Sequence, residues 1–207
     1  MRPNFITDKI EHDRFVSRVC SLVDTSSCLP NNVFKKSFYG YYFISFDWLL
    51  DEDFLMLLKE LSANFNDTTF DLWAPCKEDN FQHNYNYYPA ISFDMRSVAR
   101  NEYTKAIVYD PDPSGMSIRF RSKVLVLSGG SLEWAIWGDR EFELGVIAVS
   151  REVPAFSTGK FDYIQFVDIE GALNLTSARF SRGGLPEEVA MRFINNYSSK
   201  SILRKSE

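Results

Sequence analysis

Acidic and basic side chains meet at the tip of a predicted β-hairpin in the second half of the chain. Asp139, Arg140 and Glu141 occupy a turn between two apolar segments, and Glu133 lies near the far end of the first segment. Sites are often carried on loops that a rigid scaffold holds in place, which makes these four residues candidates for binding. An ordinary solvated turn has the same composition, and the tip lacks the third group that an enzyme site would need. Their catalytic role is left open.

A loop rich in tyrosine and asparagine is the second candidate for binding. Residues 82–88 read Gln-His-Asn-Tyr-Asn-Tyr-Tyr, and His83, Tyr85 and Tyr87 are its candidate contacts. Tyrosine and asparagine combine flat contact area with hydrogen-bonding groups, as recognition surfaces do. The alternative is a loop whose own tyrosines pack it over the sheet, and the composition favours neither interpretation.

Residues that could support metal or cofactor chemistry are sparse. The chain has only two histidines, and Cys76 with His83 is its nearest approach to a pair of metal ligands, whereas zinc needs four. The Ser-Gly-Gly-Ser of residues 128–131 precedes a predicted strand and lacks the Lys-Ser/Thr of a phosphate-binding loop. Carboxylates are numerous, but nothing in their spacing selects a hydrolytic pair. We therefore predict no metal and no cofactor.

The composition is that of a globular protein with an aromatic core. The chain has 207 residues, enough for one well-cored domain, and its 45% hydrophobic and 25% charged residues argue against disorder. Eighteen Phe, ten Tyr and four Trp predict a core built on rings, because aromatic side chains bury large areas. We expect residues 1–207 to form a single domain.

The charge balance is acidic and uneven. Residues 1–116 contain 17 Asp and Glu against 11 Lys and Arg, a net charge of −6, whereas the whole chain has a net charge of −5. Phosphate backbones reward basic surfaces, so we expect no nucleic-acid partner. An acidic surface can attract a basic protein, because complementary charge speeds the encounter.

Nothing in the sequence indicates secretion or a membrane. The three cysteines, Cys20, Cys28 and Cys76, have no CxxC spacing and imply no disulfide framework. The first residues lack the apolar core of a signal peptide, and no apolar run approaches 18 residues. We expect a cytoplasmic protein without membrane contact.

Hydrophobic periodicity predicts both helices and strands along the chain. The last helix is followed by a polar tail, residues 198–207, which we expect to be frayed. The predicted helices cover residues 7–24, 51–65, 95–107 and 186–197, and the predicted strands cover 38–46, 69–73, 161–169 and a segment from 123 that leads into a hairpin at 132–149.

The hairpin is predicted to lie at the centre of the sheet. A turn centred on residues 139–140 pairs Trp137 with Phe142 and lays Trp134 across Gly145. Both faces of this hairpin are apolar, which is typical of central strands. Short connections favour antiparallel neighbours. The predicted fold class is therefore α+β, with a mainly antiparallel sheet and helices packed on one face.

Three functions are compatible with these observations. The leading hypothesis is a non-enzymatic protein-binding domain, and one form of it is an acidic inhibitor or immunity-type protein that neutralises a basic partner. This hypothesis rests on charge and composition. The alternative is a small-molecule-binding protein or hydrolytic enzyme with a carboxylate-based pocket near residues 132–147. A third is an accessory domain that dimerises through exposed aromatic residues. The oligomeric state is left open.

Overall fold

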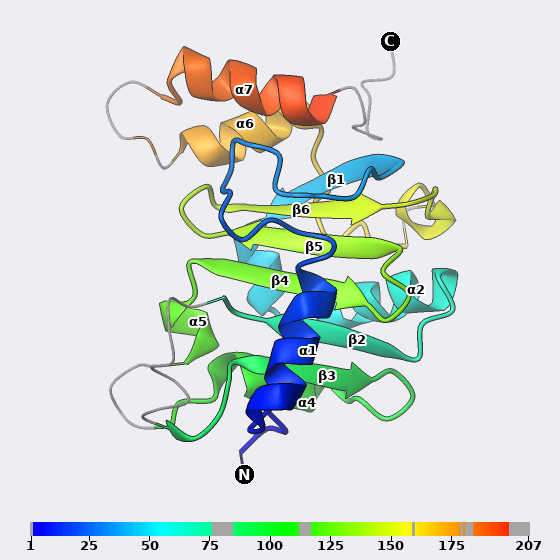
Figure 1. Cartoon of the computed structure of the whole chain (residues 1–207). Helices are drawn as coiled ribbons and strands as arrows, with labels where there is room; N and C mark the ends of the chain where they lie inside the picture. Colours follow the sequence, from blue (N-terminus) through cyan, green and yellow to red (C-terminus); the bar gives the residue numbers. More distant parts are fainter. Residues whose placement is uncertain are drawn as a thin grey trace.

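One antiparallel sheet forms the centre of the molecule in a computed structural model of the chain (Figure 1). The structure describes residues 2–75, 85–111, 117–158, 160–178, 180 and 184–198. Within these residues the sheet has six strands in the order β1-β6-β5-β4-β2-β3. The strands are β1 (Gly40–Ser45), β2 (Thr69–Trp73), β3 (Ala90–Asp94), β4 (Val124–Gly129), β5 (Trp134–Asp139) and β6 (Leu144–Val149).

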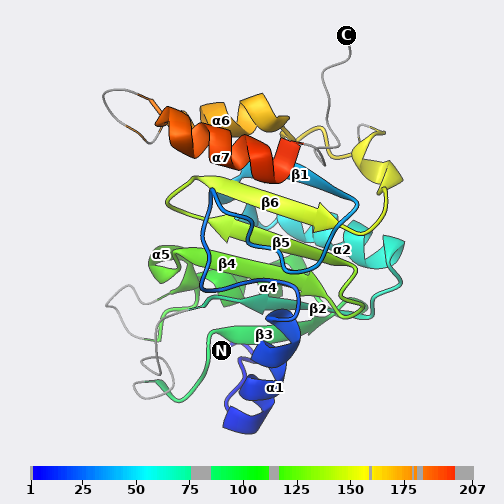
Figure 2. The ribbon, with the colours of Figure 1, turned by 45° about the horizontal axis from the view of Figure 1, so that its top comes forward.

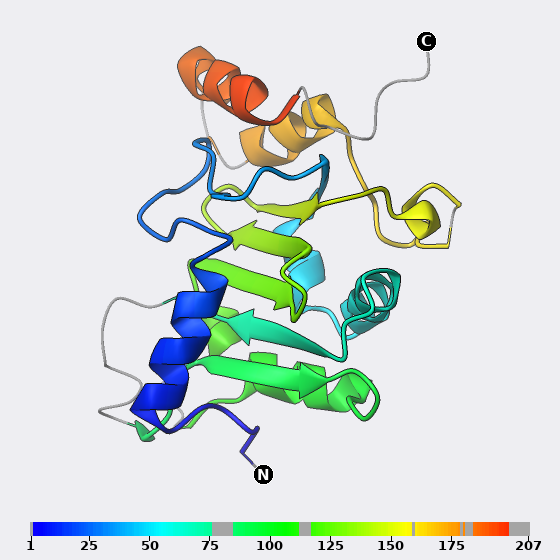
Figure 3. The same ribbon diagram turned by 45° about the vertical axis from the view of Figure 1, so that its right-hand side comes forward.

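Helices cover both faces of this sheet. Helix α1 lies on one side, whereas α2 and α4 lie on the other (Figure 3). Helices α6 and α7 pack together beside β1, at the end of the sheet opposite β3 (Figure 2). The helical segments are α1 (Lys9–Val19), η1 (Phe46–Leu50), α2 (Phe54–Asn64), α4 (Arg100–Val108), α5 (Ile118–Arg121), η2 (Pro154–Phe156), α6 (Ile169–Ser177) and α7 (Glu187–Tyr197).

The α+β class and the antiparallel sheet are confirmed, but the helices are not confined to one face. Every residue of β5 and β6 is buried, so both faces of the central strands need a cover of packed elements. Two apolar cores result, one on each face. Trp134, Ile136 and Leu58 belong to the core beneath α2, and Trp137 and Phe15 belong to the core beneath α1.

The β5–β6 hairpin has a longer turn than predicted. Asp139 pairs with Leu144 and Trp137 pairs with Val146, so a four-residue loop replaces the two-residue turn, and the predicted pairing of Trp137 with Phe142 is wrong. The partner of Trp137 has moved by four residues, an even number, so Trp137 still lies on the same face as Leu144 and Val146. Trp134 pairs with Val149 rather than covering Gly145.

A pair of glycines lets η1 cross the sheet closely. Gly138 and Gly145 are cross-strand partners in the hairpin. A methyl group at Gly138 would overlap the Leu49 side chain and lie 3.1 Å from Cε2 of Phe46. These glycines therefore leave the space into which η1 packs.

Some predicted elements coincide with the structure and others do not. β2 has the predicted bounds, and α7 agrees with the predicted helix to within one residue. The predicted strand over 161–169 is wrong, because this segment forms turns with one isolated bridge, from Val167 to Phe43, before α6 begins. The helix predicted from Met95 begins at Arg100, because Asp94 ends β3 and binds the N–H of Arg96 in a turn.

Helix α1 ends at Val19, five residues before the predicted end, and Asp8 caps it by accepting from the N–H of Glu11 at 2.8 Å. Of the predicted tail, only Ser198 lies among the described residues. None of the helices in the described ranges has the length and apolarity needed to cross a bilayer. The cytoplasmic location stays a prediction.

Candidate functional site

Asp139 points into the protein rather than away from the hairpin tip. The residue is 4% exposed, and its Oδ1 accepts from the backbone N–H groups of Glu141 at 3.0 Å and Phe142 at 3.1 Å. Burial raises the pKa of the Asp139 carboxyl, although these hydrogen bonds lower it. The side chain therefore closes the four-residue loop.

Arg140 and Glu141 also bind within the chain. Arg140 donates to the carbonyl oxygens of Ser122 at 2.8 Å and Arg119 at 2.5 Å, and its guanidinium lies 4.6 Å from the ring centroid of Phe46. Glu141 forms an exposed ion pair with Lys123 at 2.7 Å. Arg140 thus joins the hairpin to α5 and η1, which gives it a clear structural role.

Glu133 lies at the other end of β5 from Asp139. Its carboxylate pairs with Lys36 Nζ at 3.2 Å. Hydrogen bonds with Ser150 and Lys36 lower the pKa of the Glu133 carboxyl. The length of the strand therefore separates the two predicted acids.

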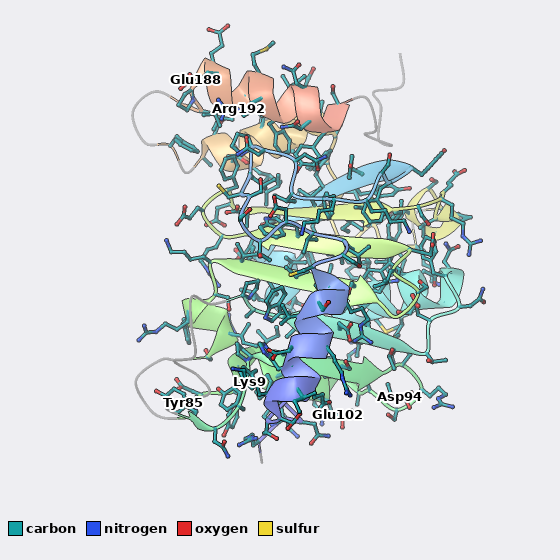
Figure 4. The ribbon with its side chains drawn as sticks, viewed as in Figure 1. Lys9, Tyr85, Asp94, Glu102, Glu188 and Arg192 are labelled. Atoms are coloured by element: carbon teal, nitrogen blue, oxygen red, sulfur yellow. The ribbon has the colours of Figure 1, made fainter. Side chains whose placement is uncertain are left out.

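The tyrosine-rich loop lies at a third place in the fold. Tyr87 is buried and stacks on Phe5, with ring centroids 4.7 Å apart. Tyr85 is partly buried, with its ring centroid 6.3 Å from that of Tyr87, and lies in the lower part of the molecule, far from α7 (Figure 4). His83 lies outside the described residues. The predicted site residues thus do not converge on one site, and their role in binding stays a prediction.

A different surface combines exposed apolar side chains with carboxylates, at the start of α2. Its backbone is set by short polar side chains. Ser45 Oγ accepts from the N–H of Asp47 at 3.4 Å where η1 begins, and Asp51 accepts from the N–H of Asp53 at 2.8 Å between η1 and α2. The apolar face of α2 is buried, which leaves Met56 on its outer side, 40% exposed.

A hollow of about 380 Å³ opens beside Met56. Tyr163, 44% exposed, contributes from the turn after η2, and its ring meets that of Trp48 edge-on at 6.1 Å between centroids. We call this site the acidic hollow; its lining is formed by Asp53, Met56, Arg100, Lys160, Phe161 and Tyr163. Three exposed acids stand next to these residues in the chain or act on the charge of Tyr163, and we call them its rim: Asp51, Glu52 and Asp162.

The two cations of the acidic hollow are already paired. Arg100 binds Asp53 at 2.6 Å, and Lys160 binds Glu60. Partial burial, together with the charge of Asp53, raises the pKa of the Tyr163 hydroxyl. The rim acids Glu52 and Asp162 are exposed and have no ion pair with any residue that the structure describes. The surface therefore combines exposed, unpaired acids with a lining of apolar side chains and paired charges.

Sequence reasoning did not find this site. Acids at the start of a helix are explained by the helix dipole, which is the role that residues 51–53 suggest in the sequence. Tyr163 fell within a predicted strand, where its ring would be core. The usable signal was the outward position of Met56 on an otherwise apolar helix, but only the fold shows that Tyr163 lies beside it.

A buried polar cluster lies beneath α1. Asp71 Oδ2 accepts from Arg18 at 2.6 Å, and its Oδ1 accepts from Ser92 at 2.5 Å. Ser128, its partner on β4, has a buried hydroxyl without a hydrogen bond to any described residue. Burial raises the pKa of the Asp71 carboxyl, against the effects of Ser92 and Arg18, which lower it. Because the Asp71 carboxylate is 2% exposed, the cluster offers a ligand no access.

A second hollow, of about 330 Å³, lies between β3, α4 and the first residues of the chain. Its acids Asp94 and Glu102 lie in the lower part of the molecule (Figure 4). Asp94 pairs with Arg96 at 3.0 Å, and Glu102 accepts from the N–H of Ala99 at 2.9 Å. The lining also contains the cations Arg2 and Lys105, and both of its acids have partners within the chain.

Comparisons with known proteins supply no function. Within the described ranges, no three Asp, Glu, His or Cys residues come together in a way that could hold a metal ion. The chain matches no protein-family model, and no curated protein or solved structure is significantly similar to it. The functional argument therefore rests on the geometry of the acidic hollow.

Proposed function

We propose that this protein is a non-enzymatic binding protein that holds a basic surface of another protein in the acidic hollow. The observation that carries the proposal is the exposure of Met56 and Tyr163, at 40% and 44%, beside a rim of carboxylates. Methionine and aromatic side chains are enriched at the centre of protein interfaces, where they supply much of the affinity.

The rim would contribute specificity and speed of association. Exposed acids such as Glu52 and Asp162 attract a basic partner over several ångströms and repel an acidic one. The carboxylates also disfavour nucleic acid as the partner, because phosphates carry the same sign of charge. An acidic inhibitor of a basic protein is one form of this function.

We do not propose an enzyme with a carboxylate pocket at the hairpin. The residues expected at that pocket, which are Glu133, Asp139, Arg140 and Glu141, all have partners within the chain. The hydrogen bonds and ion pair of Asp139, Arg140 and Glu141 support a role in holding the loop.

Capture from an extract of the native host tests the proposal. The wild-type chain is compared with the double variant Glu52→Lys/Asp162→Lys, which reverses two rim charges. The matched control is Glu187→Lys/Glu188→Lys, which makes the same charge change at exposed acids of α7, at the far end of the sheet. Far-UV circular dichroism and the melting temperature test whether each variant folds, and both should be unchanged.

The proposal predicts a basic protein that is recovered in stoichiometric amount by the wild type and by the α7 control. Reversal of the rim should reduce its measured affinity by about ten-fold or more, and raised salt should weaken it as well. Recovery of the same partner by all three proteins would overturn the assignment to the acidic hollow. Failure to recover any stoichiometric basic partner would count against the function itself.

A further inference from the structure

Helix α5 presents an aromatic ring between two arginines to solvent. Phe120 is 71% exposed, and Arg119 and Arg121 on either side of it are also exposed. Neither arginine forms an ion pair with a residue in the described part of the chain. We call these three residues the arginine knob. Aromatic and arginine side chains are the most frequent energetic anchors of protein interfaces.

The arginine knob is held in place by the hairpin. Ile118, the first residue of α5, is 3% exposed and anchors the turn in the core. Arg140 donates to the carbonyl oxygens of Arg119 and Ser122, so it fixes the backbone before and after Phe120. An anchor that is ordered before binding loses less entropy on association.

The arginine knob and the acidic hollow cover the same side of the sheet. Ile118 of α5 belongs to the apolar core that also contains Phe54 and Phe161 from the hollow's segments. Arg140 connects α5 to η1, because its guanidinium lies over Phe46. Helix α1 covers the opposite side (Figure 3). One side of the molecule therefore has a basic aromatic projection and an acidic apolar hollow.

We propose that a second copy of this chain is a partner of the acidic hollow, and that the arginine knob of each copy enters the hollow of the other. The inference rests on the proposed function, because it uses the same binding site. Two complementary surfaces on one side of a molecule can form a closed dimer, in which a two-fold axis makes each contact twice.

The chemistry of the two surfaces matches in both charge and polarity. The ring of Phe120 would lie on the apolar floor formed by Met56 and Tyr163. Arg119 and Arg121 would face the rim acids, of which Glu52 and Asp162 have no ion pair among the described residues. Arginine pairs well with carboxylates because its planar group can donate two parallel hydrogen bonds.

Sedimentation velocity of the purified full chain, from about 5 to about 500 μM, is the first measurement. The inference predicts a sedimentation coefficient that rises with concentration toward that of a dimer and a weaker association at high salt. Phe120→Ala should raise the dissociation constant by about 100-fold, because an anchor worth about ten-fold is lost at two contacts. A wild-type chain that stays monomeric throughout this range would overturn the inference.

Charge exchange gives the sharper test. Arg119→Glu/Arg121→Glu makes the knob acidic, and Glu52→Lys/Asp162→Lys makes the rim of the hollow basic. Each variant alone should be monomeric, because like charges then face each other at both contacts. An equimolar mixture should form a heterodimer, since both contacts again join opposite charges. Lys9→Glu/Arg14→Glu, which makes the same charge change on α1, serves as the control and should dimerise as the wild type does.

The outcomes separate this inference from the proposed function. If the mixture stays monomeric, the inference is overturned. If Phe120→Ala is monomeric and still recovers a basic protein from the host extract, both the inference and the function stand. If the wild type is monomeric and recovers such a protein through the rim acids, the function stands and the second copy is excluded as a partner.

Discussion

At the scale of single residues, Asp71 has a carboxyl group in a buried position that disfavours its charged form. Its carboxylate has two good partners, Arg18 and Ser92, yet it is almost fully buried beneath α1. Removing a carboxylate from water is costly, and here burial has the larger effect, so the pKa of the Asp71 carboxyl is raised above its ordinary value of 3.8. The folded state therefore binds the proton at Asp71 more tightly than the unfolded state.

This difference predicts how Asp71 affects stability as the pH changes. A carboxyl whose pKa is higher in the folded state contributes most to stability below its unfolded pKa and loses that contribution as the pH rises through the folded pKa. The free energy of unfolding of the wild type, relative to Asp71→Asn, should therefore fall as the pH rises above the unfolded pKa of about 3.9. Urea denaturation at several pH values measures it.

Asp94 is the matched control for this prediction. Its hydrogen bonds with Arg96 lower the pKa of its carboxyl, so its contribution is present at neutral pH and is lost as the pH falls. The comparison of wild type with Asp94→Asn should thus change with pH in the opposite direction. Slopes of the same sign for both variants would contradict the account of Asp71.

At the scale of elements, the hairpin and η1 depend on each other. The Gly138–Gly145 pair leaves room for Leu49 and Phe46, and Arg140 covers the ring of Phe46. The path of η1 then places the start of α2, where the acidic hollow forms. The hairpin thus positions the candidate site through η1, although the residues of its own tip bind within the chain.

Gly138→Ala should destabilise the protein. The added methyl group overlaps Leu49, and overpacking in a core costs about 1–3 kcal/mol in the free energy of unfolding. Gly130→Ala is the comparison, because its methyl group would approach Thr69 Oγ1 at 3.0 Å and its next neighbours, the Thr69 carbonyl oxygen and Asp67 Oδ1, only at 3.6 and 3.7 Å. Chemical denaturation should show a clearly larger loss for Gly138→Ala; equal losses would refute the role of the glycine pair.

Arg140→Met should loosen α5 selectively. The change removes two hydrogen bonds from a charged donor, which contribute about 1.5–3 kcal/mol each, while it keeps much of the side-chain volume. Hydrogen exchange of the Arg121 and Ser122 amides should become faster. Glu141→Gln, which breaks only an exposed ion pair, should cost less than about 0.5 kcal/mol and leave these amides protected. Unchanged exchange in Arg140→Met would show that α5 is held by other contacts.

The hydrophobic pattern of the sequence predicted the elements whose buried residues recur with a regular period. The apolar character of both hairpin faces was predicted correctly despite the wrong turn, because strand side chains alternate with a period of two. The prediction for residues 161–169 failed, because the apolar residues of this segment pack through contacts outside a strand: Phe161 packs on Phe156, Phe166 packs near Tyr42, and Val167 forms an isolated bridge to Phe43. Alternation alone does not reveal such contacts.

At the scale of the whole molecule, part of the acidic excess of the sequence lies around one site, the acidic hollow. The excess of acidic residues lies in the first half of the chain, but the acidic hollow also includes Phe161, Asp162 and Tyr163 from the second half. The site therefore could not be read from the sequence, because its parts are brought together only when the turn after η2 packs beside α2. The expectation of a basic partner did follow from charge, and it stays a prediction.

The most direct test of the central claim is a map of chemical-shift changes in the ¹⁵N-labelled chain during titration with a synthetic peptide of alternating arginine and phenylalanine. The account predicts that the largest changes occur at Asp53, Met56 and Tyr163, decrease at high salt, and vanish in Glu52→Lys/Asp162→Lys. Changes centred instead on the hollow beside β3, at Ser97 and Lys105, or unaltered binding by that variant, would contradict it.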